Sequence, residues 1–377
     1  MFESIFGNDT FIGVDIGTSS VKVVELKVVN GSPVLSNYAW MSLGESMSGK
    51  GDVNSEYFYA ALPRLLKKIL KKANIKGKNV YISLPSFSGL IMLIDFPEIA
   101  SDDMEQAIRF EAQKHIPTSL DDVVINWEVI GKKQVSKNVP VVNLNDDVLK
   151  KEEDEKTGND VMLQVLLIVA SKEKVMKYEN LIKTAGLNLR AINLETFPIV
   201  RALIGNDPGS FVIVDIGANI CNAILVERGI IKVNRTINAG GLDITKTIAK
   251  GMGIDNERAS ELKTSEKNFF EQNSPISFFA LETITGEVSR IIKAYTKDND
   301  EKKIDAIILS GGTASMVGIS DYFSDKLKIK TMIGNPLSKI KYDPVLEPII
   351  SDIRSKFSIC IGSAIGGVDE YLKEKAN

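Results

Sequence analysis

Two segments of this 377-residue chain repeat one short pattern, and they begin at Phe11 and Phe211. The first reads FIGVDIGTSSVKVVEL and the second reads FVIVDIGANICNAILV. Each combines a β-rich run, the sequence Asp-Ile-Gly, a turn of small or polar residues and a second β-rich run, which is typical of a β-hairpin. A repeat of this size indicates a duplicated α/β architecture, in which two similar halves face each other across a cleft.

Composition limits the chemistry that such a cleft can carry. Lys and Arg total 46 and Asp and Glu total 49, so the net charge of −3 excludes a strongly basic nucleic-acid-binding protein. Two cysteines, Cys221 and Cys360, and one histidine, His115, are too few for a disulfide framework or a Cys- or His-rich metal site. We expect Cys221 to be a core residue and His115 to be a cap or core residue. The site must therefore be built from carboxylates, hydroxyls, lysines and backbone amides.

The N-terminal sequence has neither the basic region nor the long apolar run of a secretory signal. The longest apolar runs, at residues 161–171 and 357–368, are shorter than the ~20 residues that span a bilayer. We therefore expect a cytoplasmic protein. The apolar residues Phe2, Ile5 and Phe6 are expected to pack against the first sheet, with contact to a membrane or a partner as the alternative.

The two Asp-Ile-Gly turns are suited to phosphate groups. Glycine permits a tight turn and close backbone approach, and successive N–H groups in such a turn form a concave anion site. Asp15 and Asp215 stand where they could hold Mg²⁺, which prefers oxygen ligands. Hydroxyls and a lysine beside the first turn would add donors and a positive charge. The predicted phosphate-binding residues are Asp15, Gly17, Thr18, Ser19, Ser20, Lys22, Gly217, Ala218 and Asn219.

A third glycine turn follows a buried strand that we expect at residues 305–309. Gly311, Gly312 and Thr313 come between this strand and a helix. Two glycines at the end of a strand let a flat ring or a ribose lie against bare backbone. After two phosphate-type hairpins, we interpret this turn as the nucleoside side of the same site.

The order of these motifs resembles the superfamily of actin, Hsp70 and sugar-kinase ATPases, in which the two hairpins hold the β- and γ-phosphates and the Gly-Gly turn holds adenosine. The resemblance implies ATP and Mg²⁺ as ligands. It also implies that Glu195, in a segment similar to the first connecting helix, orients the attacking water. Gly240 and Gly241 would approach phosphate, and Lys263 lies in a segment similar to the helix that touches the ribose. That segment departs from bacterial actins because Ser260 replaces the first of their two acidic residues.

Within this superfamily the chain resembles the PilM family of type IV pilus assembly proteins, which is related to the division protein FtsA. The resemblance rests on the Phe-x-x-Ile-Phe-Gly start, on residues 95–117 and on Gly334-Asn335-Pro336-Leu337. It implies a cytoplasmic ATP-binding scaffold with at most slow ATPase activity. The scaffold would bind the N-terminal peptide of a PilN-like protein at the inner face of the inner membrane. Pilus motor ATPases and a second copy of the chain are further partners that it implies.

The expected fold is an actin-like α/β body (ribonuclease H-like and duplicated) of two lobes, with an inserted subdomain of the type called 1C. Lobe I covers residues 1–84 and 170–206, and the insert covers residues 85–169 with a polar loop at 131–160. Lobe II covers residues 207–240 and 308–358, with a subdomain 2B at 241–307 and a connecting helix at 359–377. Amphipathic spacing predicts further helices at residues 55–73 and 101–115.

Two other functions are alternatives. An FtsA-like filament protein ends in a membrane-targeting amphipathic helix, and residues 371–377 offer no apolar face of that kind. A small-molecule kinase of the sugar-kinase branch needs a carboxylate base opposite the phosphates, and no segment resembles a sugar-binding signature. The basic run Lys67, Lys68, Lys71 and Lys72 is expected to be a solvated face, with acidic lipid or a partner as the alternative. Arg109 and Glu111 are expected to be an exposed helix pair, with a peptide contact as the alternative.

Overall fold

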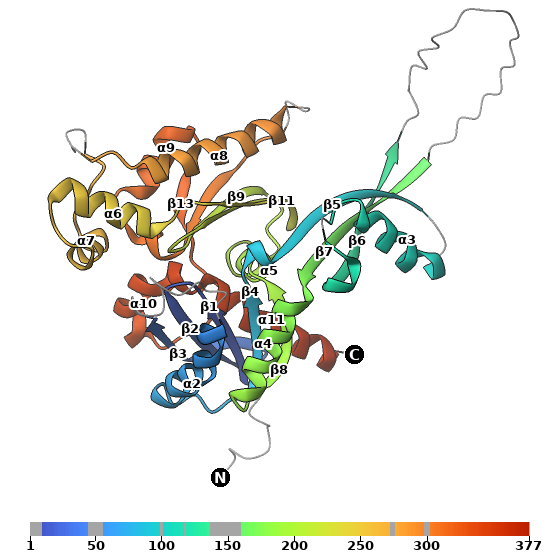
Figure 1. Ribbon diagram of the computed structural model, residues 1–377, viewed down its shortest axis with the longest axis horizontal. Helices are drawn as coiled ribbons and strands as arrows, with labels where there is room; N and C mark the ends of the chain where they lie inside the picture. The colour runs from blue at the N-terminus through green and yellow to red at the C-terminus, as the bar shows by residue number, and fades with distance from the viewer. Residues whose placement is uncertain are drawn as a thin grey trace, which may run out of the picture. The chain divides into compact units, whose positions relative to one another are not determined.

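The computed structural model describes residues 10–43, 56–98, 101–116, 118–135, 160–271, 276–297 and 302–376. The chain divides into two compact units (Figure 1). The larger unit consists of residues 1–89 and 171–377, and the smaller unit consists of residues 90–170. No helix in the described ranges is long and apolar enough to cross a membrane. Phe2, Ile5 and Phe6 lie outside the described residues.

The first half of the larger unit is a five-stranded sheet in the order β3-β2-β1-β4-β8. β1 pairs antiparallel with β2 and parallel with β4, so the predicted first hairpin is confirmed. Helix α11 packs on β1, β2 and β4, while α2 and α4 pack together, α2 on β3 and α4 on β4 and β8. The bounds are β1 Thr10–Ile16, β2 Ser20–Val29, β3 Ser32–Ser42, β4 Asn79–Leu84, β8 Asn188–Leu194, α2 Glu56–Lys72, α4 Lys172–Thr184 and α11 Ser358–Ala376.

The second half repeats this topology in the order β11-β10-β9-β12-β13. β9 again pairs antiparallel with the next strand and parallel with a later one, so the predicted duplication is confirmed. The bounds are β9 Ser210–Ile216, β10 Cys221–Glu227, β11 Ile230–Ile237, β12 Ala306–Ser310, β13 Thr331–Ile333, α6 Gly241–Met252, α7 Asn256–Lys263, α8 Phe279–Thr296, α9 Ile319–Leu327 and α10 Glu347–Ile353.

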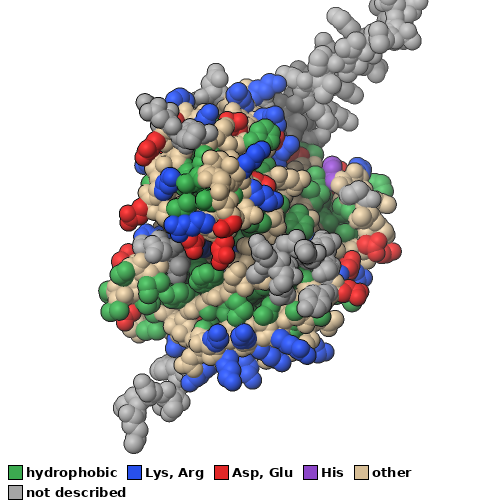
Figure 2. Space-filling model, turned by 60° about the vertical axis from the view of Figure 1, so that its left-hand side comes forward, with side chains coloured by type: hydrophobic (Ala, Val, Ile, Leu, Met, Phe, Trp, Pro, Cys, Tyr) green, Lys and Arg blue, Asp and Glu red, His purple; other side chains and the backbone are tan. Residues whose placement is uncertain are grey.

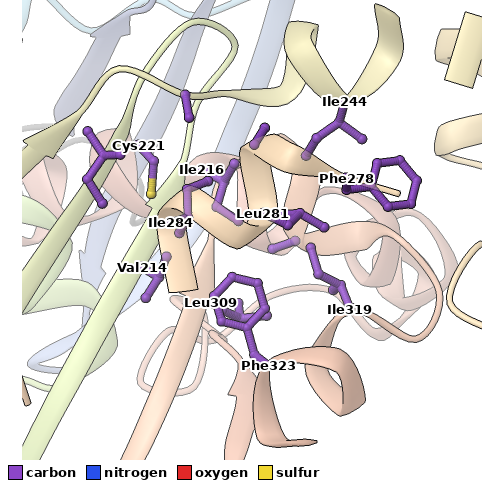
Figure 3. Close-up of a cluster of buried hydrophobic side chains, with 14 of the residues drawn as sticks. Val214, Ile216, Cys221, Ile244, Phe278, Leu281, Ile284, Leu309, Ile319 and Phe323 are labelled. Carbon is purple, nitrogen blue, oxygen red and sulfur yellow. The ribbon is translucent and has the colours of Figure 1, made fainter. Parts of the chain in front are cut away.

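Alternating residues of β9 and β12 build the core of this second half. Val214, Ile216 and Leu309 turn toward apolar side chains of α6, α8 and α9 (Figure 3). The period of two puts this whole set on one face of the sheet, where burial stabilises the fold by about 25 cal/mol per Å² of apolar surface. Cys221 lies in the same cluster and is fully buried, which confirms the prediction that it is a core residue.

Two helices cross in direct contact because glycines line the crossing. Helix α5 (Thr196–Leu203) begins after Glu195 and packs against α11. A Cβ atom at Gly362 of α11 would lie 1.8 Å from the carbonyl oxygen of Pro198 in α5. Arg201 of α5 also donates to the carbonyl oxygen of Gly362 at 3.0 Å. No side chain larger than hydrogen fits at this crossing without moving the helix backbones.

The smaller unit is a three-stranded sheet in the order β5-β7-β6, packed against one helix. Its elements are β5 Gly89–Pro97, α3 Ser101–Gln113, β6 Val123–Val135 and β7 Asp160–Ser171. Ile108 of α3 is fully buried among the apolar residues of β5 and β7. Of the two roles expected for His115, the core role is wrong because the residue is exposed and lies 3.6 Å from Glu111, whereas its N–H donates to the carbonyl oxygen of Ala112 at 3.0 Å at the end of α3. Most of the predicted polar loop at 131–160 lies outside the described residues.

Candidate functional site

A cavity of about 1590 Å³ in the larger unit is lined by the turns of both hairpins. It brings together Asp15, Gly17, Thr18, Ser19, Ser20, Lys22, Glu195, Asp215, Gly217, Ala218, Asn219, Gly241, Lys263, Gly311, Gly312 and Thr313. Gly240 does not line the cavity, although sequence analysis groups it with these residues. Segments from both halves of the chain therefore converge on one space.

The first turn carries a buried ion pair. The N–H of Gly17 donates to the carbonyl oxygen of Ser20 at 3.0 Å, which closes the turn. The Nζ atom of Lys22 lies 2.8 Å from Oδ2 of Asp15, whose side chain is 3 % exposed. Burial alone would lower the pKa of Lys22, but the charge of Asp15 and the hydrogen bond to it raise that pKa above its usual value. Lys22 therefore stays charged in the cavity wall.

The second turn supports the start of a helix. Gly217 closes the turn by donating to Ile220 at 3.0 Å, and its carbonyl oxygen accepts from the N–H of Gly241 at 2.8 Å. Gly240 packs against the turn itself, because a Cβ atom there would lie 2.5 Å from the carbonyl oxygen of Ala218. This contact explains why Gly240 lies outside the cavity wall. The N-terminus of α6 then borders the cavity, and the positive end of its helix dipole favours an anion there, although the N–H groups of Gly241 and Leu242 already donate to the second turn.

Two further carboxyl groups line the cavity near the ion pair. Burial raises the pKa of Asp215 to about 6, while Lys22 and a hydrogen bond from Ser310 oppose the rise and Asp15 adds to it. Burial and the charges of Asp15 and Asp215 raise the pKa of Glu195 well above its usual value. Glu195 also accepts a hydrogen bond from the N–H of Ser86 at 3.2 Å. One lysine thus faces three carboxyl groups, and the site carries an excess of buried acid.

This donor set fits Mg²⁺ only if other oxygens complete its shell. Within the described ranges, no three side chains of His, Cys, Asp or Glu are grouped as a protein-only metal site. Mg²⁺ commonly takes one or two carboxylates and fills its remaining positions with water and phosphate oxygens. Asp15 and Asp215 satisfy that requirement, and a divalent cation beside them would oppose the burial and the charge of Asp15, which together raise the pKa of Asp215.

The third turn is held by backbone contacts that require glycine. Gly311 has a φ of 86°, and a Cβ atom there would lie 2.4 Å from the carbonyl oxygen of Ile216. Its N–H donates to the carbonyl oxygen of Ser355 at 3.0 Å, which joins the turn to the segment before α11. Thr313 is buried beside the two glycines. The turn offers bare backbone to the cavity, as predicted.

Lys263 supplies a second cation to the cavity from α7. Its Nζ atom donates to the carbonyl oxygen of Gly241 at 2.9 Å and to the hydroxyl of Thr245 at 2.8 Å. Burial, together with the charge of Lys356, lowers the pKa of Lys263 to about 8. An anion bound nearby would favour the charged form of this lysine.

Sequence analysis missed some residues of the cavity wall. Lys356 lines the cavity, and the carbonyl oxygen of its neighbour Ser355 accepts a hydrogen bond from the third turn. Trp40, on a strand that was not predicted, lines the cavity and is 58 % exposed. The sequence could have suggested Lys356 as a lining residue, since it stands just before the predicted connecting helix at 359–377.

The repeated sheets, paired hairpins and crossing helices define an actin-like fold. The family model described as type IV pilus assembly protein PilM matches residues 13–142 and 138–367, so the chain belongs to the PilM family. The predictions of the fold and of the family are thereby confirmed.

Solved structures share this fold, and curated proteins are similar to the chain in sequence. A chain of the PilM–PilN type IV pilus biogenesis complex matches 95 % of this chain and 98 % of its own length, with a TM-score of 0.74 and 22 % identity. Ethanolamine utilization protein EutJ from Carboxydothermus hydrogenoformans matches 95 % of this chain and 90 % of its own, with a TM-score of 0.52 and 14 % identity. Cell division protein FtsA of Bacillus subtilis is 22 % identical over 364 residues, covering 87 % of this chain and 79 % of that protein.

Proposed function

We propose that this chain is an ATP-binding scaffold of type IV pilus assembly that binds the N-terminal peptide of a PilN-like protein. The partner would hold it at the cytoplasmic face of the inner membrane. The observation that supports nucleotide binding is the single cavity onto which both Asp-Ile-Gly turns, the Gly-Gly-Thr turn and the N-terminus of α6 converge. The structural similarity to a chain of the PilM–PilN complex supports the partner.

In this proposal the parts of the cavity take different parts of the nucleotide. The turns after β1 and β9 present N–H groups to the phosphates, and α6 directs the positive end of its dipole toward them. Gly311, Gly312 and Thr313 lie against the nucleoside, with Lys263 beside it. Asp15 and Asp215 would hold Mg²⁺, which would neutralise charge on the phosphates when it is bound.

The carboxyl groups favour slow hydrolysis. Glu195 is the candidate that orients the attacking water. Burial and the charges of Asp15 and Asp215 raise its pKa, which disfavours the charged form that would orient the water. ATP would then act chiefly as a ligand that shifts a conformational equilibrium. For this, ATP must bind one arrangement of the two halves of the larger unit more tightly than another.

The proposed peptide site lies on the smaller unit. Phe110 of α3 is 67 % exposed, and Arg109 next to it is also exposed. An exposed aromatic residue beside a cation is a typical anchor at a protein interface. These two residues are therefore our candidates for contact with the partner peptide.

Isothermal titration calorimetry with MgATP tests the nucleotide site. We expect Asp215→Ala to weaken the affinity for MgATP by at least about tenfold, since it removes a proposed Mg²⁺ ligand. The matched control is Asp321→Ala, which removes an exposed carboxylate on α9. Unchanged ATP affinity in Asp215→Ala would refute the assignment.

Fluorescence anisotropy with a labelled N-terminal peptide of the PilN-like partner tests the peptide site. We expect Phe110→Ala to weaken the affinity for the peptide by about tenfold or more. Phe279→Ala is the control, because Phe279 is 78 % exposed on the larger unit. Equal effects of the two variants, or tight peptide binding by Phe110→Ala, would remove Phe110 from the site.

A further inference from the structure

Helix α2 presents a face made only of cations. From Arg64 onward, every exposed residue of α2 is basic, namely Arg64, Lys67, Lys68, Lys71 and Lys72. The four lysines follow Arg64 by three, four, seven and eight residues, so all five share one side of the helix. The opposite side buries Phe58, Leu62, Leu66 and Ile69 in the first half of the larger unit. We call these five residues the α2 basic face.

The α2 basic face is not neutralised by the chain around it. None of its five residues has a carboxylate of the described ranges within the 4.0 Å ion-pair distance. The sequence between Glu56 and Asp95 contains no Asp or Glu, but it contains Arg64, Lys67, Lys68, Lys71, Lys72, Lys76 and Lys78. Helix α4 packs beside α2 and carries Glu173 and Glu179, of which Glu173 is paired with Lys177 at 2.5 Å.

The positive surface continues past the end of α2 into a hollow of about 350 Å³. Lys27, Lys76 and Lys78 line this hollow and are exposed. Its one carboxylate, Glu25, is 3 % exposed and accepts hydrogen bonds from the N–H of Gly77 and the amide of Asn37. In Figure 2, Lys and Arg side chains gather along the bottom edge of the molecule, the level at which Figure 1 shows α2.

This concentration of charge is unusual in a chain whose net charge is −3. The five cations of the α2 basic face lie within about 12 Å of helix length. They are therefore closer together than a Debye length or two at physiological salt, and their fields add. Such a face attracts an extended anionic surface more strongly than it attracts a single anion.

We propose that the α2 basic face and the lysines of the adjoining hollow dock on the surface of an anionic phospholipid bilayer. Four of the five residues are lysines, which act as point charges, whereas nucleic-acid recognition favours the bidentate fork of arginine. The exposed positions of this face also carry no aromatic side chain on which a base could stack. A convex helix meets a plane along its length but offers no groove for the side chains of a peptide.

Docking of this kind is electrostatic, because the face exposes no large apolar side chain that could enter the hydrocarbon. It therefore differs from the insertion of an amphipathic helix, which buries apolar area and resists salt. It is also independent of the proposed PilN-like peptide site, which lies on the smaller unit. The bilayer contact would orient a scaffold that a peptide alone only tethers.

Vesicle co-sedimentation of the full chain tests the proposal. We expect binding to phosphatidylcholine vesicles with about 30 % phosphatidylglycerol, and no binding to pure phosphatidylcholine or in about 0.5 M NaCl. The variant K67Q/K68Q/K71Q/K72Q should lose affinity by roughly six hundredfold, at roughly fivefold for each of the four charges. The quadruple Lys→Arg variant at the same positions should still bind.

The matched control removes four exposed lysines of the second half, K250Q/K293Q/K297Q/K330Q. It changes the net charge equally, and it should retain vesicle binding within a few-fold. Unfolding curves of all variants check that the fold is kept. Absence of vesicle binding by the unaltered chain, equal losses in the two Gln variants, or salt-resistant binding would overturn the proposal. So would α2-dependent binding to duplex DNA that exceeds binding to the vesicles.

Discussion

The two hairpins of the larger unit share a backbone but differ in what opposes their aspartates. Asp15 pairs in register with Lys22, and Asp215 pairs in register with Asn222. Lys22 forms an ion pair with Asp15, whereas Asn222 accepts a hydrogen bond from Thr236 at 3.0 Å. The first aspartate is therefore paired by its own hairpin, whereas the second has no cation on its hairpin, and burial, with a contribution from Asp15, raises its pKa to about 6.

The hairpins also differ two residues before each aspartate. Gly13 stands where the second hairpin has Ile213, which is fully buried. A Cβ atom at Gly13 would lie 1.7 Å from the carbonyl oxygen of Cys360 in α11. The first strand therefore gives up a side chain so that the connecting helix can approach. The first hairpin is therefore specialised for close packing against α11. The second hairpin instead carries an aspartate, Asp215, that has no cation on its own hairpin.

The largest expected effect comes from the helix contact. Gly13→Ala should lower the free energy of unfolding by at least about 3 kcal/mol, because the new methyl group overlaps the backbone of α11. The matched change Ile213→Val should cost only about 1 kcal/mol. Urea denaturation followed by circular dichroism measures both. If Gly13→Ala were the milder of the two, the packing difference between the hairpins would be wrong.

The next effect concerns the ion pair. Lys22→Met leaves Asp15 buried without its cation and should cost about 3 kcal/mol, since removing one partner of a buried pair exposes the full desolvation cost of the other. Asn222→Val, at the equivalent position, removes one hydrogen bond and should cost about 1 kcal/mol. Both unfolding curves are measured in the presence of a metal chelator, so that no metal ion takes the place of the lysine. Similar losses would mean that the two aspartates are equivalent.

The elements that local sequence could predict are those with a local cause. The hairpins follow from alternating apolar residues around Asp-Ile-Gly, and α2 and α3 follow from helical periodicity at 55–73 and 101–115. Even the difference between Lys22 and Asn222 could be read from the sequence, since each stands seven residues after its aspartate.

What the sequence could not predict depends on distance in space. Strand β8 and helix α4 have weak local signals, and they are stabilised by packing on β4. Lys356 lines the cavity because its segment is joined to the third turn, where the N–H of Gly311 donates to the carbonyl oxygen of Ser355. The raised pKa of Glu195 arises from burial and from two aspartates that lie 180 residues before it and 20 residues after it. Residue types indicated a phosphate site, but its balance of charge emerged only from the folded arrangement.

Asp215 should respond to substitution in the opposite direction from Asp15. A carboxyl group whose pKa is raised from 3.8 unfolded to about 6 folded destabilises the protein above pH 6, and the penalty fades as pH falls toward 4. Asp215→Asn should therefore stabilise the protein in chelator by up to about 2 kcal/mol at pH 7.5 and by little at pH 4. Asp15→Asn should destabilise it, because Lys22 loses its partner. Urea titrations at the two pH values decide, and a destabilised Asp215→Asn protein at pH 7.5 would contradict the charge assignment.

The smallest effect concerns the cation that serves the second half. Lys263 comes from α7 and contacts a backbone carbonyl and a hydroxyl, whereas Lys22 contacts a carboxylate. Its pKa, lowered from 10.5 to about 8, imposes a penalty that is present below pH 8 and disappears as pH rises toward 10.5. As pH rises from 8 to 10, the free energy of unfolding of the unaltered chain should therefore increase by about 1 kcal/mol relative to that of Lys263→Met. Lys250→Met, an exposed lysine of α6, should show no such slope. If the difference in unfolding free energy between the unaltered chain and Lys263→Met did not change with pH, the ammonium group of Lys263 would be solvated. Lys263 would then not be a buried counterpart of Lys22.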